Sequence, residues 1–193
     1  MLIRFGYGFF MLSLPLYAKI LLLIIAIILL FYIVNKITAF LTELFKPFKK
    51  GKKYWCRVKA VSDGDTLTCY RFNVRRSETK LRFAYIDAPE SSQAYGKEAH
   101  KLVSRLVGGK LIRVQITDVD RYGRCVGVIY RYRKNVNEEL VKRGAAWVYD
   151  DYIKDPKRLK YMMSLQDKAK KQKKGLWHGT HPIRPSTYRK QKK

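Results

Sequence analysis

An uncharged apolar run near the N-terminus is the strongest constraint on how this chain can fold. The run "ILLLIIAIILLFYIV" covers residues 20–34 and is extended by "LPLYA" before Lys19 and by "ITAFL" after Lys36. A helix that crosses a bilayer needs about 20 apolar residues, and the long side chains of Lys19 and Lys36 can reach the interfaces at the ends of the run. We therefore predict a transmembrane helix over residues 16–38, within an N-terminal anchor of residues 1–44.

A cleaved signal peptide is the alternative interpretation of this run. The run is long and no small-x-small cleavage site follows it closely, which favours a retained, single-pass anchor. The basic residues around the run bear on its orientation. The positive-inside rule favours a cytoplasmic C-terminal part, because only Arg4, Lys19 and the amino terminus precede or open the run, whereas six lysines follow it: Lys36, Lys46, Lys49, Lys50, Lys52 and Lys53.

The charge of the chain indicates a polyanionic partner. Lys and Arg number 41 against 15 Asp and Glu, and the formal net charge is +26 over 193 residues. Such an excess is typical of proteins that bind nucleic acid or an anionic membrane surface. A merely solubilising excess of charge is the alternative. Cysteine use adds little, because Cys56, Cys69 and Cys125 are an odd number at no metal-site spacing, and we interpret them as small core residues.

The remainder of the chain predicts a small barrel. Residues 45–53, "FKPFKKGKK", are interpreted as a basic linker, residues 54–178 as the folded domain and residues 179–193 as an irregular basic tail. Five β-rich runs cover residues 54–61, 66–72, 80–86, 110–117 and 124–133, and Asp63-Gly64 indicates a hairpin between the first two. Helices are predicted over residues 96–107, from Asn137 as the cap to Gly144, and from Asp155-Pro156 to about Lys174. This pattern favours a mainly β (α+β) fold: an OB-type five-stranded Greek-key barrel with three helices.

Carboxylates and arginines stand near the predicted strand ends. Asp65 follows the hairpin turn, and Asp87 and Glu90 end the third predicted strand. Clustered carboxylates need neutralisation, which a hard cation such as Ca²⁺ or Mg²⁺ provides through oxygen ligands. In the alternative, Asp63 and Asp65 are turn residues and Glu90 caps the next helix. We accept that alternative for Asp63 only, since Asp is a poor strand residue at position 65.

Two arginines complete a set suited to phosphoryl transfer. Arg82 lies between apolar neighbours in a predicted strand, and Arg124 follows the turn signal "DRYG". A guanidinium group fits the paired oxygens of a phosphodiester. A cation and arginines can stabilise charge on phosphorus while a spare carboxylate takes a proton from water. Taken singly, each arginine is more often a surface ion pair.

Six motifs carry a resemblance to a known family. In order they are "VSDGDTL" (61–67), "LRFAYIDAPE" (81–90), "YGKEA" (95–99), "DRYGR" (120–124), "VNEELVKRGAAWVY" (136–149) and "KKGLW" (173–177). In order and spacing they resemble the staphylococcal nuclease (thermonuclease or micrococcal nuclease) family over residues 54–178. The resemblance implies an OB-fold barrel with three helices and hydrolysis of DNA and RNA phosphodiesters with Ca²⁺ and water.

The resemblance also implies roles for particular residues. Asp65, Asp87 and the main-chain carbonyl of Ala88 match the calcium ligands, although Ala88 replaces a threonine of the founding member. Glu90 matches the proposed general base, and Arg82 and Arg124 match the phosphate-binding arginines. The expected substrate-binding residues are Arg121, Tyr122 and Tyr152. Asp150 falls near a second wall position that is often tyrosine, and the short loop between Glu90 and Tyr95 implies a more open substrate rim.

The sequence also allows functions other than that of a nuclease. The main alternative to an enzyme is a non-catalytic, membrane-tethered module that binds nucleic acid or a partner on the same fold. A purely electrostatic membrane adaptor would leave the motifs unexplained. We expect no zinc site at His100, His178 or His181, which lack suitable partners, and a monomeric domain. A weak calcium site fills at about 10⁻⁴–10⁻³ M, which favours an extracytoplasmic domain against the positive-inside count.

Overall fold

The computed structural model describes residues 14–45, 48–71 and 77–191. The chain divides into two units, Met1–Lys46 and Pro47–Lys193. Arg4, Lys46 and the end of the second predicted strand at Phe72 lie outside the described residues.

The first unit contains one long helix, α2 (Leu16–Phe45). Within it, Leu16–Leu41 has a mean hydropathy of 2.8 and is long and apolar enough to cross a membrane. Its large apolar side chains are exposed, among them Leu23, Ile28 and Phe31. An exposed apolar surface of this kind is typical of a segment that contacts a membrane or another protein. A signal sequence near the N-terminus meets the same criterion of length and composition, so membrane crossing stays a prediction.

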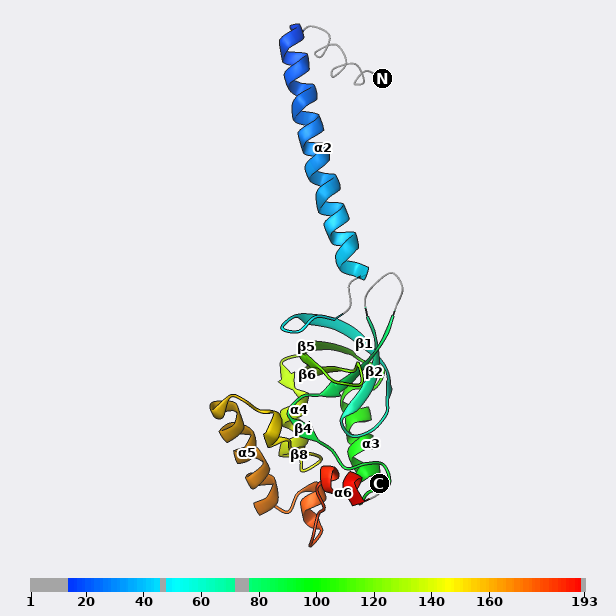
Figure 1. Ribbon diagram of the computed structural model, residues 1–193, viewed down its shortest axis with the longest axis vertical. Helices are drawn as coiled ribbons and strands as arrows, with labels where there is room; N and C mark the ends of the chain where they lie inside the picture. The colour runs from blue at the N-terminus through cyan, green and yellow to red at the C-terminus, as the bar shows by residue number, and fades with distance from the viewer. Residues whose placement is uncertain (1–13, 46–47, 72–76, 192–193) are drawn as a thin grey trace, which may run out of the picture. The chain divides into compact units, whose positions relative to one another are not determined.

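The second unit is built around the predicted five-stranded barrel, which is confirmed (Figure 1). Its strands are β1 (Lys53–Val61), β2 (Thr66–Arg71), β3 (Glu78–Phe83), β5 (Leu111–Val119) and β6 (Cys125–Arg131). They pair in the order β3-β2-β1-β5-β6, and a parallel β3–β6 pairing closes the barrel. Side chains alternate between the two faces of a strand. In β3, Leu81 and Phe83 are therefore buried in the core while Arg82 points the other way.

The third strand ends earlier than the sequence predicts. Instead of continuing over residues 80–86, β3 stops at Phe83 and the chain turns through Tyr85, whose φ is +68°. The short strand β4 (Ile86–Asp87) then pairs with β8 (Trp147–Val148). Asp87 therefore lies on a separate strand, and Glu90 lies in the loop that follows it.

Three helices accompany this barrel, as predicted: α3 (Gly96–Val107), α4 (Val136–Lys142) and α5 (Pro156–Lys171). Helix α3 contacts β1 and α4 contacts β6, whereas α5 packs on α4 and β8. Asp155 caps α5 as expected. The predicted cap of α4 was wrong, because Asn135 accepts the N–H groups of Asn137 and Glu138. The Asn137 side chain is instead buried in the core.

The C-terminal tail is not irregular throughout, which corrects the prediction for residues 179–193. A short helix, α6 (Pro185–Gln191), forms there. Figure 1 shows α6 in red at the C-terminal end of the chain. Tyr188 Oη lies 3.1 Å from Ser92 Oγ, and Gln93 Nε2 donates to the carbonyl of Ile183. These contacts bring the end of the chain next to the loop that follows β4.

Candidate active site

Asp65 is fixed at the start of β2 by its turn. The Asp63 carboxylate accepts the backbone N–H of Asp65 at 3.0 Å, as a turn aspartate does. The Asp65 carboxylate is buried, and both of its oxygens accept hydrogen bonds. Its Oδ1 accepts from Thr66 and Arg82, and its Oδ2 accepts the backbone N–H of Ala88 at 3.1 Å. This last bond joins the β1–β2 turn to the segment after β4.

Arg82 joins the two buried carboxylates. Its Nη1 lies 3.1 Å from Asp65 Oδ1, and its Nη2 lies 2.9 Å from Asp87 Oδ1. The side chains of Asp65 and Asp87 are only 5% and 4% exposed. The strand register explains the approach, because Arg82 pairs with Thr66, the residue after Asp65.

Arg82 balances only part of the negative charge of Asp65 and Asp87. Burial raises the pKa of Asp65 to about 6, although the charge of Arg82 acts in the opposite direction. Burial, and then the negative charge of Asp65, raises the pKa of Asp87 as well. A further positive charge next to the pair would stabilise both ionised forms.

Glu90 is held in a tight loop. Its carbonyl accepts the N–H of Gln93 at 2.8 Å, and the backbone of Gly96 packs directly against that carbonyl. A Cβ at position 96 would lie 1.8 Å from the Glu90 oxygen, so only glycine fits there. The Glu90 side chain is 35% exposed, and its Oε1 lies 2.7 Å from Nη1 of Arg189 in α6.

Arg124 is oriented by a carboxylate that the sequence analysis did not single out. Nε of Arg124 lies 2.7 Å from Asp120 Oδ2, while Asp120 Oδ1 accepts the N–H groups of Tyr122 and Arg124. Burial opposes the charge of Asp120, but the N–H donors and Arg124 together lower its pKa. The only signal in the sequence was the turn pattern "DRYG".

A cleft gathers most of the predicted site residues. It is lined by residues that include Asp65, Arg82, Ala88, Glu90, Arg121, Tyr122, Arg124 and Tyr152. Asp87 lies beneath them, covered by Arg82 and Arg189. Tyr122 and Tyr152 are 69% and 65% exposed on the walls.

The second wall position differs from the expectation for Asp150. The Asp150 carboxylate pairs with Arg184 at 3.3 Å. Tyr149 lines the cleft instead, with its ring 4.5 Å from the ring of Tyr152 in an edge-on arrangement. An aromatic pair is therefore available for stacking at this wall. The one-residue offset between Tyr149 and Asp150 was missed in the sequence.

The donor set fits a hard cation. Two buried carboxylates contact one guanidinium group, and the N–H of Ala88 donates to one of them, which places the Ala88 main chain next to the pair. Within residues 14–45, 48–71 and 77–191, no three His, Cys, Asp or Glu side chains gather as a metal-binding group. Two carboxylates with a main-chain carbonyl and waters suit Ca²⁺ or Mg²⁺ bound with modest affinity, whereas a structural zinc site needs four protein ligands.

Comparisons with known proteins give similarities to nucleases. A family model described as "Staphylococcal nuclease homologue" matches residues 80–179. An uncharacterised endonuclease of Haemophilus influenzae is 42% identical over 142 residues, which cover 74% of this chain and 76% of that protein. An uncharacterised endonuclease of Escherichia coli O157:H7 is 39% identical over 137 residues, covering 70% of this chain and 85% of that protein. A staphylococcal-like nuclease of Arabidopsis thaliana is 40% identical over 114 residues, covering 59% and 34% respectively.

Proposed function

This chain belongs to the staphylococcal nuclease family, and on that premise we propose that it is a calcium-dependent endonuclease. It hydrolyses phosphodiester bonds of DNA, RNA or both, with little sequence preference. The observation that carries the proposal is the single cleft that gathers Asp65, Arg82, Glu90 and Arg124 above Asp87.

In this proposal each residue of the cleft has a distinct task. Asp65, Asp87 and the Ala88 carbonyl hold the cation. The cation, when bound, supplies positive charge that stabilises the developing charge on phosphorus. Arg82 and Arg124 bind the non-bridging phosphate oxygens, to which their planar guanidinium groups are suited. Exposed Tyr122 and Tyr152, with Arg121, contact the neighbouring nucleotide.

Glu90 acts on the water. As a carboxylate in the cleft wall it can accept a proton while the water oxygen bonds to phosphorus and the ester bond to the leaving oxygen breaks. Its backbone is fixed by Gly96, so its position over the cleft is set by the loop. In this role the other acids stay with the cation, and Glu90 alone takes the proton.

The decisive variant is Glu90→Gln. It removes the base while keeping the side-chain shape, so turnover should fall by roughly 10²–10⁴, the usual contribution of a general base, while DNA binding survives. The full chain in detergent is incubated with single-stranded and duplex DNA, with calcium or with chelator. Equal cleavage by parent and variant would remove Glu90 from the mechanism. Binding without cleavage by the parent under any divalent ion would favour the non-catalytic module.

We also propose that α2 is a retained single-pass anchor and that the catalytic domain is extracytoplasmic. The length and apolar composition of Leu16–Leu41 support the anchor. The modest donor set supports a compartment rich in calcium, since sites of this kind fill at about 10⁻⁴–10⁻³ M. A nuclease outside the cytoplasm is also separated from the genome of its own cell.

A further inference from the structure

The C-terminal helix α6 brings a third arginine into the candidate active site. Arg189 lies 102 residues from Asp87 and 99 from Glu90 along the chain, yet its guanidinium group contacts both carboxylates. The match to the family model ends at residue 179, before α6 begins. We propose that Arg189 competes with the cation for Asp87, so that the C-terminal segment raises the calcium concentration at which the site fills. This inference rests on the proposed function.

Arg189 occupies the atoms that a cation would need. Its Nη2 lies 3.0 Å from Oδ1 and 3.1 Å from Oδ2 of Asp87. Arg82 takes Oδ1 as well. Both oxygens of a carboxylate that is 4% exposed are therefore covered by guanidinium groups. Since Arg189 spans both oxygens, a cation that takes Asp87 as a ligand has to displace it.

The Arg189 side chain also forms an ion pair with Glu90, the proposed general base. Nη1 of Arg189 lies 2.7 Å from Glu90 Oε1, so one guanidinium group links the cation ligand to the base. Arg189 stays charged in this place: burial opposes its charge, but the hydrogen bond to Glu90 and the charge of Asp87 raise its pKa above the usual value. Arg189 therefore adds positive charge next to Asp87, although burial keeps the pKa of Asp87 raised even with Arg189 in place.

The attachment of α6 is light enough to be reversed. Within the described part of the chain, its seven residues bury only Pro185. Apart from the contacts of Arg189, the segment is held by polar contacts of Tyr188 with Ser92, of the Ile183 carbonyl with Gln93 and of Arg184 with Asp150. The guanidinium group of Arg184 also lies over the ring of Trp147, 5.4 Å from its centroid. Most of these groups are exposed or half-buried, where ion pairs and hydrogen bonds contribute little. Release of α6 therefore leaves the barrel core unchanged.

Calcium affinity of the full chain in detergent tests this competition, measured by isothermal titration calorimetry without substrate. Arg189→Gln should bind calcium at least roughly tenfold more tightly, because a charge-assisted contact no longer has to be broken first. Lys190→Gln is the matched control, since it removes one positive charge from the same helix and should change the affinity by less than about twofold. A chain that ends at Pro182 should show the same gain as Arg189→Gln, and Asp87→Asn should lose binding. Thermal unfolding checks that each variant is folded.

The outcomes separate this inference from the proposed function. If the parent and Arg189→Gln bind calcium equally, or the variant binds more weakly, the competition is wrong and the calcium site stands. If Lys190→Gln gains as much as Arg189→Gln, the effect is one of general charge and the competition is again wrong. If none of the proteins binds calcium, both proposals are overturned.

Discussion

At the scale of single residues, the orientation of Arg124 depends on Asp120. The two side chains form an ion pair four residues apart, and the same carboxylate shapes the turn between β5 and β6 through two backbone N–H groups. Asp120→Asn keeps an acceptor but removes the charge, so Arg124 should be held less firmly. We expect turnover to fall by about tenfold or more, measured by the rate of DNA cleavage. Asp118→Asn, at a nearby aspartate that is 63% exposed, should leave the rate nearly unchanged.

Asp120→Asn also tests how the stability of the fold depends on pH. The pKa of Asp120 is lowered in the folded chain from 3.8, so its ionised form stabilises the fold. That contribution is present above pH 3.8 and is lost as the pH falls through the lowered pKa. In urea unfolding, the parent should exceed Asp120→Asn in stability at about pH 7, and the difference should shrink below about pH 4. A difference that grows on acidification would contradict the assignment.

What the sequence could predict at this scale was limited by where each partner lies. Asp65, Arg82, Asp87 and Glu90 stand in local motifs, and the structure brings them together. Arg189 stands in a basic tail without a motif, and its partners lie about a hundred residues away. Such a contact depends on tertiary packing, for which no local pattern exists.

At the scale of elements, helix α3 was predicted more closely than the end of strand β3. The bounds of α3 follow from apolar spacing and a terminal Gly pair, and they agree with the structure. The end of β3 could not be read in the same way, because residues 80–86 keep a β-rich composition through the turn at Tyr85. That turn is stabilised from outside the strand, by Asn137.

Asn137 links three elements through its buried amide. Its Oδ1 accepts the N–H of Ile129 in β6, and its Nδ2 donates to the carbonyls of Ala84 and Gly127. Asn137→Ala would remove the side-chain partner of the Ile129 N–H and of the Ala84 carbonyl, whereas the Gly127 carbonyl keeps the N–H of Ala84. We therefore expect a loss of roughly 2–4 kcal/mol in the free energy of unfolding. Asn135→Ala, which removes the cap of α4 and a hydrogen bond to the Glu138 carboxylate, should lose about 1 kcal/mol. Urea unfolding compares the two, and a smaller loss at position 137 would contradict this role.

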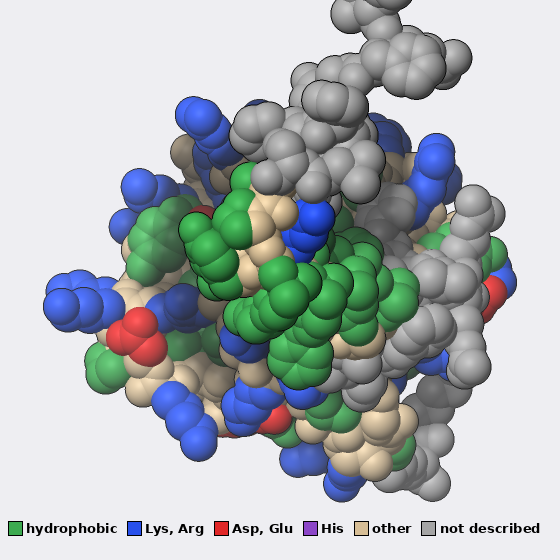
Figure 2. Space-filling view, turned by 90° about the horizontal axis from the view of Figure 1, so that it is seen from above, with side chains coloured by type: hydrophobic (Ala, Val, Ile, Leu, Met, Phe, Trp, Pro, Cys, Tyr) green, Lys and Arg blue, Asp and Glu red, His purple; other side chains and the backbone are tan. Residues whose placement is uncertain are grey.

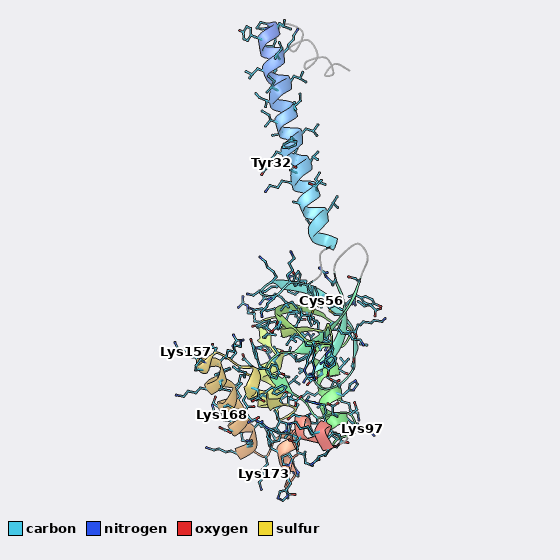
Figure 3. All side chains as sticks on the ribbon, viewed as in Figure 1. Tyr32, Cys56, Lys97, Lys157, Lys168 and Lys173 are labelled. Atoms are coloured by element: carbon cyan, nitrogen blue, oxygen red, sulfur yellow. The ribbon has the colours of Figure 1, made fainter. Side chains whose placement is uncertain are left out.

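At the scale of the whole molecule, the positive charge is spread over the surface. Figure 2 shows Lys and Arg side chains over the visible face with few acids between them. In Figure 3, Lys157 and Lys168 lie along α5 and Lys173 lies just beyond it. These side chains are exposed, and they give sequence-independent attraction to a polyanion that weakens as salt rises. Such attraction requires no contact with the bases, which is consistent with the proposed low sequence preference.

Two arguments about the membrane orientation of the domain disagree. The lysines after α2 favour a cytoplasmic domain by the positive-inside rule, whereas a calcium site of modest affinity needs the calcium of an outer compartment. We expect the domain to be extracytoplasmic, because a calcium-dependent nuclease is inactive where its calcium site stays empty. Protease added to intact cells should then remove the domain that follows Pro47 and leave a fragment with α2.

The control for this experiment is the same digestion after the membrane is permeabilised, together with a cytoplasmic marker that must survive in intact cells. If the domain is protected in intact cells and digested after permeabilisation, it lies inside. The calcium site would then have to fill at cytosolic concentrations, which are far below those that sites of this kind need. In that compartment calcium would displace Arg189 less readily, because a scarce cation would have to compete with a guanidinium group for Asp87. A domain digested in intact cells instead lies in a compartment rich in calcium, as the proposed competition with Arg189 requires.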